Sequence, residues 1–128
     1  MSEIWQLSAT ELAQRIAGRQ LSSVEVVEAH LTRIDAVNPA LNAVVRVLAD
    51  QARASAVSAD KRLAAGKVAG PLHGVPFTVK ENIDVARLPT TWGVPALAHA
   101  VVPADAPVVE SITSDLRLAA IGAKRPVA

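Results

Sequence analysis

Two helix starts near the N-terminus are almost identical in sequence, and they are the strongest local constraint on the fold. Ser8-Ala9-Thr10-Glu11 and Ser22-Ser23-Val24-Glu25 both match the capping box, in which the Ser and Glu side chains each accept a hydrogen bond from the other residue's backbone N–H. Each box also has the apolar pair that fixes the angle of entry into a helix, Leu7 with Leu12 and Leu21 with Val26. The sequence therefore predicts two consecutive, well-capped helices.

The apolar pattern and the helix-breaking residues set the expected lengths of these helices. The first is predicted to run to Ala17 and to end at Gly18, because glycine accepts the positive φ that is common after a helix. The second is predicted over residues 23–37, with an apolar face made of Val24, Val27, Leu31 and Ile34. Asn38-Pro39 is expected to end it, since proline disfavours helical geometry in the residue before it.

A short strand and a third helix are expected next. The β-branched residues of segment 41–48 favour a strand. Asp50 is predicted to cap an alanine-rich helix that continues through Ala65 and is closed by Gly66. The only aromatic side chains are two Trp and one Phe, and aromatic residues normally supply much of the buried area of a small core. We therefore expect helices that pack closely through alanines.

The second half of the chain begins with glycines and prolines that lead into a predicted strand at residues 77–80. A long irregular stretch follows, and Asp105 is expected to cap a final helix over Val108 and onward. This order predicts the α/β class, with N-terminal helices and the first strands of a mixed sheet flanked by helices. Two strands make a poor sheet, so we expect the fold to be incomplete within these residues.

Charge and composition exclude several classes of function. The formal net charge is +1 and the basic residues form no stripe, so neither nucleic acid nor a membrane is an expected partner. The absence of cysteine excludes disulfides, thiolate metal sites and a cysteine nucleophile. His30, His73 and His99 have no carboxylate at ligand spacing, so no metal site and no cofactor are expected. No secretory signal and no membrane span are recognisable, and a cytoplasmic location is the expectation.

Lys80 is the candidate functional residue, and the residues alone leave two interpretations open. Val75, Phe77 and Val79 alternate onto one face of the predicted strand, which places Lys80 on the other face. Lys80 is then either an ordinary solvent-facing lysine or a catalytic base at the start of a binding loop. Within the loop that follows, Trp92 is expected to pack under the backbone. Glu81 and Asp84 are expected either to pair with Lys80 or to face solvent.

The longer segment around Lys80 decides between these interpretations by resemblance. GPLHGVPFTVKENIDV, followed by LPTTWG, is similar to the stretch around the catalytic lysine of amidase signature enzymes, and the resemblance extends over about residues 6 to 110. It implies an amide hydrolase with a Ser–cis-Ser–Lys mechanism, a small amide as substrate, and Lys80 as the base. Residues 1–128 would be the N-terminal part of an amidase domain. Within it, residues 1–66 form a helical region with one short strand, 70–93 the lysine-bearing strand and loop, and 111–128 an atypical tail.

The sequence also departs from the family's pattern. The family's two serines lie in a Gly/Ser-rich stretch, and none of the serines in this chain has such surroundings, so Lys80 is the one catalytic residue assigned. Arg87 stands where the family usually has glycine, and we expect a disturbed loop there. The tail is expected to reflect truncation or a frameshift, and the isolated chain is expected to be inactive. Two alternatives stay open. One is a non-catalytic module that forms homo-oligomers through exposed apolar surface. The other is a protein like the glutamyl-tRNA(Gln) amidotransferase A subunit.

Overall fold

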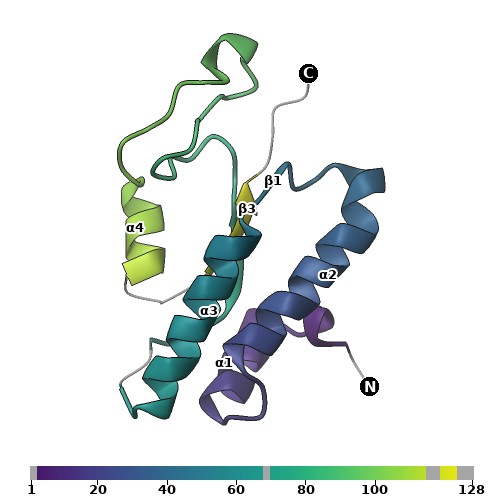
Figure 1. Cartoon of the computed structure of the whole chain (residues 1–128), viewed down its shortest axis with the longest axis vertical. Coiled ribbons are helices and arrows are strands. Elements are labelled where there is room, and N and C mark those ends of the chain that lie inside the picture. Colours follow the sequence, from purple (N-terminus) through teal and green to yellow (C-terminus); the bar gives the residue numbers. More distant parts are fainter. Residues whose placement is uncertain (1–2, 68–69, 115–118, 124–128) are drawn as a thin grey trace.

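The computed structural model describes residues 3–67, 70–114 and 119–123. Three α-helices lie at the N-terminal side, and a small sheet is packed against them (Figure 1). A long loop leads from the sheet to the last helix. In chain order the elements are η1 (Ile4–Gln6), α1 (Ala9–Ala17), α2 (Ser23–Leu41), β1 (Arg46–Val47), α3 (Ala49–Ala64), β2 (Pro76–Val79), η2 (Pro95–Leu97), α4 (Pro107–Ser114) and β3 (Ala119–Ala123).

Both predicted capping boxes are present. The Ser8 hydroxyl accepts from the Glu11 N–H at 3.2 Å, and the Glu11 carboxylate accepts from the Ser8 N–H at 2.9 Å. Ser22 and Glu25 repeat the arrangement at 3.1 and 2.8 Å. Helix α1 ends at Ala17 as predicted, but Gly18 has a φ of −77° and the left-handed position is taken by Arg19, at 57°. The expectation of a positive φ at Gly18 was therefore wrong.

The predicted end of the second helix was also wrong. Helix α2 continues through Pro39 to Leu41, and Asn42 ends it with a φ of 47°. A proline in the last turn removes one N–H, but the Asn42 N–H still reaches the Asn38 carbonyl at 2.6 Å. The Asn38 side chain bonds the backbone of Val44. The expected strand over 41–48 is consequently reduced to β1.

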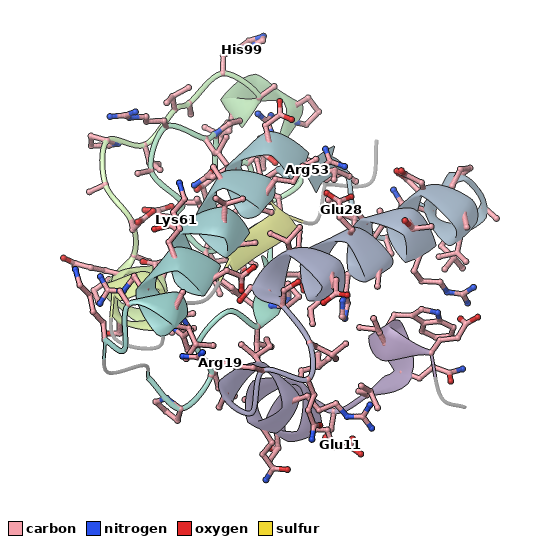
Figure 2. All side chains as sticks on the ribbon, turned by 60° about the horizontal axis from the view of Figure 1, so that its bottom comes forward. Glu11, Arg19, Glu28, Arg53, Lys61 and His99 are labelled. Atoms are coloured by element: carbon pink, nitrogen blue, oxygen red, sulfur yellow. The ribbon has the colours of Figure 1, made fainter. Side chains whose placement is uncertain are left out.

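Helix α3 confirms the packing through alanine but not the expected cap. It begins at Ala49, and its N-cap residue Leu48 forms no side-chain cap bond, so the predicted Asp50 cap was wrong. Ala52 and Ala56 are fully buried against Val27 and Leu31 of α2. Figure 2 shows Arg53 of α3 and Glu28 of α2 pointing toward one another, and they form a two-bond ion pair.

The sheet is mixed, as predicted, with strand order β1-β3-β2. Strand β3 lies in the middle, antiparallel to β1 and parallel to β2. It comes from the tail, where no strand was predicted. The predicted strand over 77–80 is present as Pro76–Val79. Asp105, expected to cap α4, accepts a 2.6 Å bond from the Ala86 N–H across the loop.

The start of α2 is the point where the two halves of the chain meet. The Asp60 carboxylate of α3 accepts the N–H groups of Ser23 and Val24 at 2.7 and 3.2 Å. Ser23 is fully buried and lies against Gly74, in the turn before β2. A Cβ on Gly74 would come within 2.1 Å of the Ser23 Oγ and 2.9 Å of its Cβ. Only glycine therefore fits at position 74 without displacing α2.

Gly74→Ala is predicted to destabilise the chain more than Gly66→Ala does. Both glycines have a positive φ, 77° and 66°, but Gly66 has nothing within 4 Å of the added Cβ. The Gly66 variant should lose only the cost of the left-handed backbone, about 1–2 kcal/mol. The Gly74 variant should lose about 1–3 kcal/mol more from overpacking. Urea unfolding of both variants measures the difference, and equal losses would contradict the described contact.

Stability should also fall with acid through the two capping boxes. The bonds that Glu11 accepts from the hydroxyl and backbone of Ser8 lower its pKa, and those from the backbone and hydroxyl of Ser22 lower the pKa of Glu25. A lowered folded-state pKa means that the stabilisation is complete above the unfolded value, near 4.3. It is lost as the pH falls through the folded-state value.

The double variant Glu11→Gln/Glu25→Gln, followed by urea unfolding between pH 6 and 3, should therefore show a shallower pH dependence than the parent chain. Two parallel curves would show that these carboxylates do not contribute.

Candidate functional site

A tight turn at residues 70–75 sets where the lysine-bearing strand begins. His73 is buried, and its Nε2 donates to the Ala59 carbonyl of α3 at 2.9 Å. Gly74 lies against Ser23 of α2, and Val75 enters the core that α1 and α2 share. The turn is thus held by three helices. His73 therefore has a structural role in this turn.

The alternation predicted for the strand is present at Val75, Thr78, Val79 and Lys80, whereas Phe77 is only half-buried, and Lys80 lies immediately after the strand. Val75 and Val79 are buried, whereas Thr78 and Lys80 are exposed. The Lys80 carbonyl accepts the Ile83 N–H at 3.0 Å, which starts a turn directly at the lysine. Within residues 3–67, 70–114 and 119–123, no carboxylate lies within ion-pairing distance of its amine. In this described part of the chain, Lys80 is therefore a lysine without a charged partner on a rigidly placed backbone.

Glu81 and Asp84 shape the loop and do not pair with the lysine. The Glu81 carboxylate accepts a short hydrogen bond from the backbone N–H of Thr91, a buried residue. The Asp84 carbonyl accepts the Ala106 N–H at 2.9 Å. The start of the loop after Lys80 is therefore hydrogen-bonded both to Thr91 and to Ala106.

Arg87 adopts the backbone shape for which glycine is usual, with a φ of 66°. Its N–H donates to the Val102 carbonyl at 2.9 Å, and the Val102 N–H donates to the Leu88 carbonyl at 3.1 Å. Pro89 and Val101 continue this antiparallel contact. Arg87 thus adopts the left-handed conformation, and backbone hydrogen bonds connect the two sides of the loop.

The prediction that Trp92 packs under the loop backbone was wrong. Its side chain is not packed under the loop, because the residue is 67% exposed. Its φ of 53° is followed by 79° at Gly93. Two consecutive residues after Thr91 therefore have left-handed backbone conformations.

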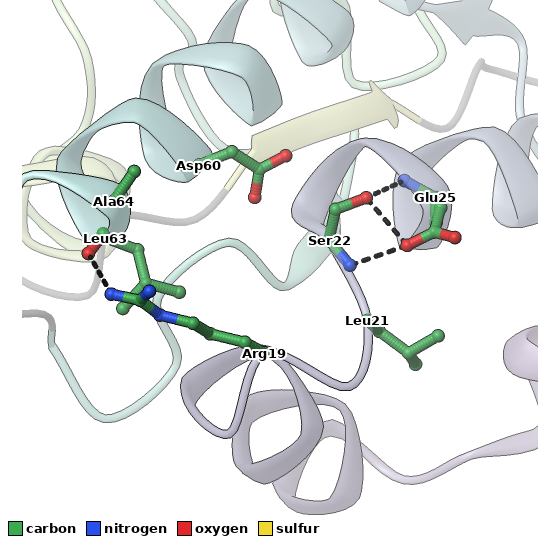
Figure 3. A pocket seen from close by; sticks show the side chains of 7 residues that line it. All are labelled: Arg19, Leu21, Ser22, Glu25, Asp60, Leu63 and Ala64. Carbon is green, nitrogen blue, oxygen red and sulfur yellow. Dashed lines mark hydrogen bonds between the residues drawn. The ribbon is translucent and has the colours of Figure 1, made fainter.

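A separate pocket of about 290 Å³ lies between the α1–α2 turn and the end of α3 (Figure 3), and its lining includes Arg19, Asp60 and Glu25. Its polar groups already have partners. Arg19 donates to the Leu63 carbonyl at 3.3 Å, Glu25 bonds Ser22, and Asp60 caps α2. No residue of the described 70–93 segment lines this pocket. This pocket therefore belongs to the packing around the N-terminus of α2.

No metal-binding group of three or more His, Asp or Glu side chains occurs in the part of the chain that the structure describes. His30 bonds the Val26 carbonyl at 2.7 Å, and Figure 2 shows His99 at the far tip of the loop. Ser8 and Ser22 are helix caps, and Ser23 is buried in the core. Among the described helices, none is long and apolar enough to cross a membrane.

Comparison with known proteins places this geometry in a family. Residues 25–115, which include the turn, the strand and Lys80, match the family model described as Amidase. The chain belongs to the amidase signature family. It is 50% identical over 109 residues to the indoleacetamide hydrolase of Bradyrhizobium diazoefficiens, covering 85% of this chain and 21% of that protein. It is 46% identical over 112 residues to the A subunit of the glutamyl-tRNA(Gln) amidotransferase of Acidothermus cellulolyticus, covering 88% and 22%.

The solved structures agree with the α/β fold class. A bacterial aryl acylamidase of the amidase signature enzymes superposes with a TM-score of 0.86 at 30% identity, covering 94% of this chain and 26% of that one. The chain thus spans about a fifth to a quarter of the length of the family members that it matches.

Proposed function

We propose that this amidase-family chain contributes the general base to the hydrolysis of a small carboxylic amide, and that Lys80 is that base. The observation that supports this best is the combination of family membership with the geometry of residues 70–93. A strand that begins at a turn held by three helices ends at the buried Val79, and the next residue is a lysine that has no charged partner among the described residues. We further propose that residues 1–128 are the N-terminal part of an amidase domain, with its divisions at 1–66, 70–93 and 111–128.

In the proposed reaction, the part played by residues 1–128 is proton transfer at Lys80. A serine hydroxyl is a weak nucleophile until a neighbouring group accepts its proton, and Ser–Lys pairs are a known variant of the serine triad. The Lys80 amine would take the proton through a second serine, the first serine would attack the amide carbonyl, and water would release the acid after the amine leaves. We place both serines outside these residues, so the isolated chain is proposed to be inactive.

The similar proteins support a second candidate function within the amidase signature family. The A subunits of glutamyl-tRNA(Gln) amidotransferases are among the similar proteins at 37–46% identity, so glutamine is a second candidate substrate under the same chemistry. In either case we propose no nucleic-acid or membrane contact by this segment and no cofactor. A cytoplasmic location remains a prediction.

A chimera tests the role of Lys80. Residues 1–110 of this chain replace the matching segment of the Bradyrhizobium indoleacetamide hydrolase, and amide hydrolysis is assayed. The chimera should hydrolyse its amide, and Lys80→Met should lower kcat about 10²–10⁴-fold, the usual contribution of a general base. The matched control is Lys61→Met, because Lys61 is also an exposed lysine but lies on α3. This variant should leave kcat unchanged. An active Lys80→Met chimera would disprove the proposal.

A serine-directed fluorophosphonate probe tests whether the nucleophile is supplied from elsewhere. The purified 128-residue chain should remain unlabelled, because none of its serines has the Gly/Ser-rich surroundings of the family's nucleophile, whereas the chimera should be labelled. Stoichiometric labelling of the isolated chain would show that it carries its own nucleophile.

A further inference from the structure

Glu81 follows Lys80 directly and lies in the tight turn that begins at the lysine. The Lys80 carbonyl accepts the Ile83 N–H at 3.0 Å, which makes Glu81 the second residue of a four-residue turn. The carboxylate of Glu81 accepts a hydrogen bond from the backbone N–H of Thr91. This side chain therefore connects the turn at Lys80 to a segment farther along the loop.

The Thr91 end of this bond is buried and firmly placed. Thr91 is 7% exposed, its carbonyl accepts the Val94 N–H at 2.8 Å, and its hydroxyl accepts the Gly93 N–H at 3.4 Å. Trp92, which follows, has a left-handed φ, and such a conformation persists only where surrounding contacts impose it. A hydrogen bond from a backbone N–H to a carboxylate is also stronger than one between neutral groups. Glu81 is thus anchored to a well-defined part of the loop.

The bond acts on Lys80 in two ways. It holds the peptide after the lysine in place, while the buried Val79 holds the residue before it, so the direction in which the lysine side chain leaves the backbone is set. It also occupies the carboxylate that is nearest in sequence, and among the described residues no carboxylate forms an ion pair with the Lys80 amine. A lysine paired with a carboxylate is favoured in its charged form, in which it accepts no proton.

We propose that Glu81 is a positioning residue for Lys80, which orients the lysine and leaves its amine free by bonding the Thr91 N–H. This inference rests on the proposed role of Lys80 as the base, because a surface lysine needs no such orientation.

Asp105 provides a matched comparison within the same loop. Its carboxylate accepts the Ala86 N–H at 2.6 Å, so it is also a carboxylate bonded to a part-buried backbone N–H. Ala86 lies beyond the turn at Lys80, and backbone bonds of Asp84 and Arg87 hold that part of the loop as well. Loss of the Asp105 bond should therefore lower the stability of the loop without moving the lysine.

Kinetics of the chimera between residues 1–110 of this chain and the Bradyrhizobium indoleacetamide hydrolase test this role. Glu81→Ala should lower kcat about 10- to 100-fold with KM changed less than about twofold, because a misplacement of about 1 Å can cost about 10²-fold in rate. Glu81→Gln should keep most of the activity, since an amide oxygen accepts the same N–H. Asp105→Ala is the control and should leave kcat unchanged.

Amide NMR of the full 128-residue chain gives a second measurement that depends neither on catalysis nor on folding of the chimera. The Thr91 N–H should exchange slowly with deuterium in the parent and in Glu81→Gln, and much faster in Glu81→Ala. The order parameter of the Lys80 N–H should fall from about 0.85, the value of a rigid backbone, toward about 0.6 in Glu81→Ala. It should stay at the parent value in Asp105→Ala.

The outcomes separate this inference from the proposed function. A fully active Glu81→Ala chimera beside an inactive Lys80→Met chimera would overturn the role of Glu81 and leave Lys80 as the base. Equal losses of kcat in Glu81→Ala and Asp105→Ala, or an unchanged exchange rate at Thr91 in Glu81→Ala, would also overturn it. An active Lys80→Met chimera would instead disprove the base, and the positioning role would be lost with it.

Discussion

The rest of the structure depends on the way the N-terminus of α2 is buried. A helix start normally has free N–H groups that need water or a cap. Here the Ser22–Glu25 box satisfies some of them, and Asp60 of α3 accepts two more. Charge-assisted bonds of this kind are each worth about 1.5–3 kcal/mol, and a buried N–H left without a partner costs a comparable amount. Because its backbone donor is satisfied, Ser23 can lie fully buried against Gly74.

That contact connects the packing of the helices to the function that we propose for Lys80. Gly74 joins the helical half to the strand that ends at Lys80, and His73 adds a bond to α3 next to it. The lysine's backbone position is therefore fixed from the N-terminal side by helices and from the C-terminal side by the Glu81–Thr91 bond. The catalytic base that we propose at Lys80 would need its geometry held to within a fraction of an ångström, and these contacts fix its backbone.

The sequence predicted the features that are local. Capping boxes depend on residues three apart, and the alternation of β2 depends on residues two apart, so both were readable. Asp60 was not recognised as a cap, because its partner Ser23 is distant in sequence. Strand β3 was missed because AAIGA has weak β-propensity and is a strand through its two neighbours. The exposure of Trp92 accompanies two consecutive positive φ angles, at Trp92 and Gly93, and such an angle is not expected for tryptophan from its residue type. The role of Lys80 stays a prediction that comes from the resemblance of its flanking residues, since its own pattern also fits a surface lysine.

We propose that the helices around Gly74 and the Glu81–Thr91 bond hold Lys80 where a serine can use it as a base. A crystal structure of the chimera between residues 1–110 of this chain and the Bradyrhizobium indoleacetamide hydrolase measures this directly. We expect the Lys80 Nζ to lie about 2.6–3.2 Å from a serine Oγ, the reach of a general base. An Nζ that extends into solvent, with no serine hydroxyl within that distance, would contradict it.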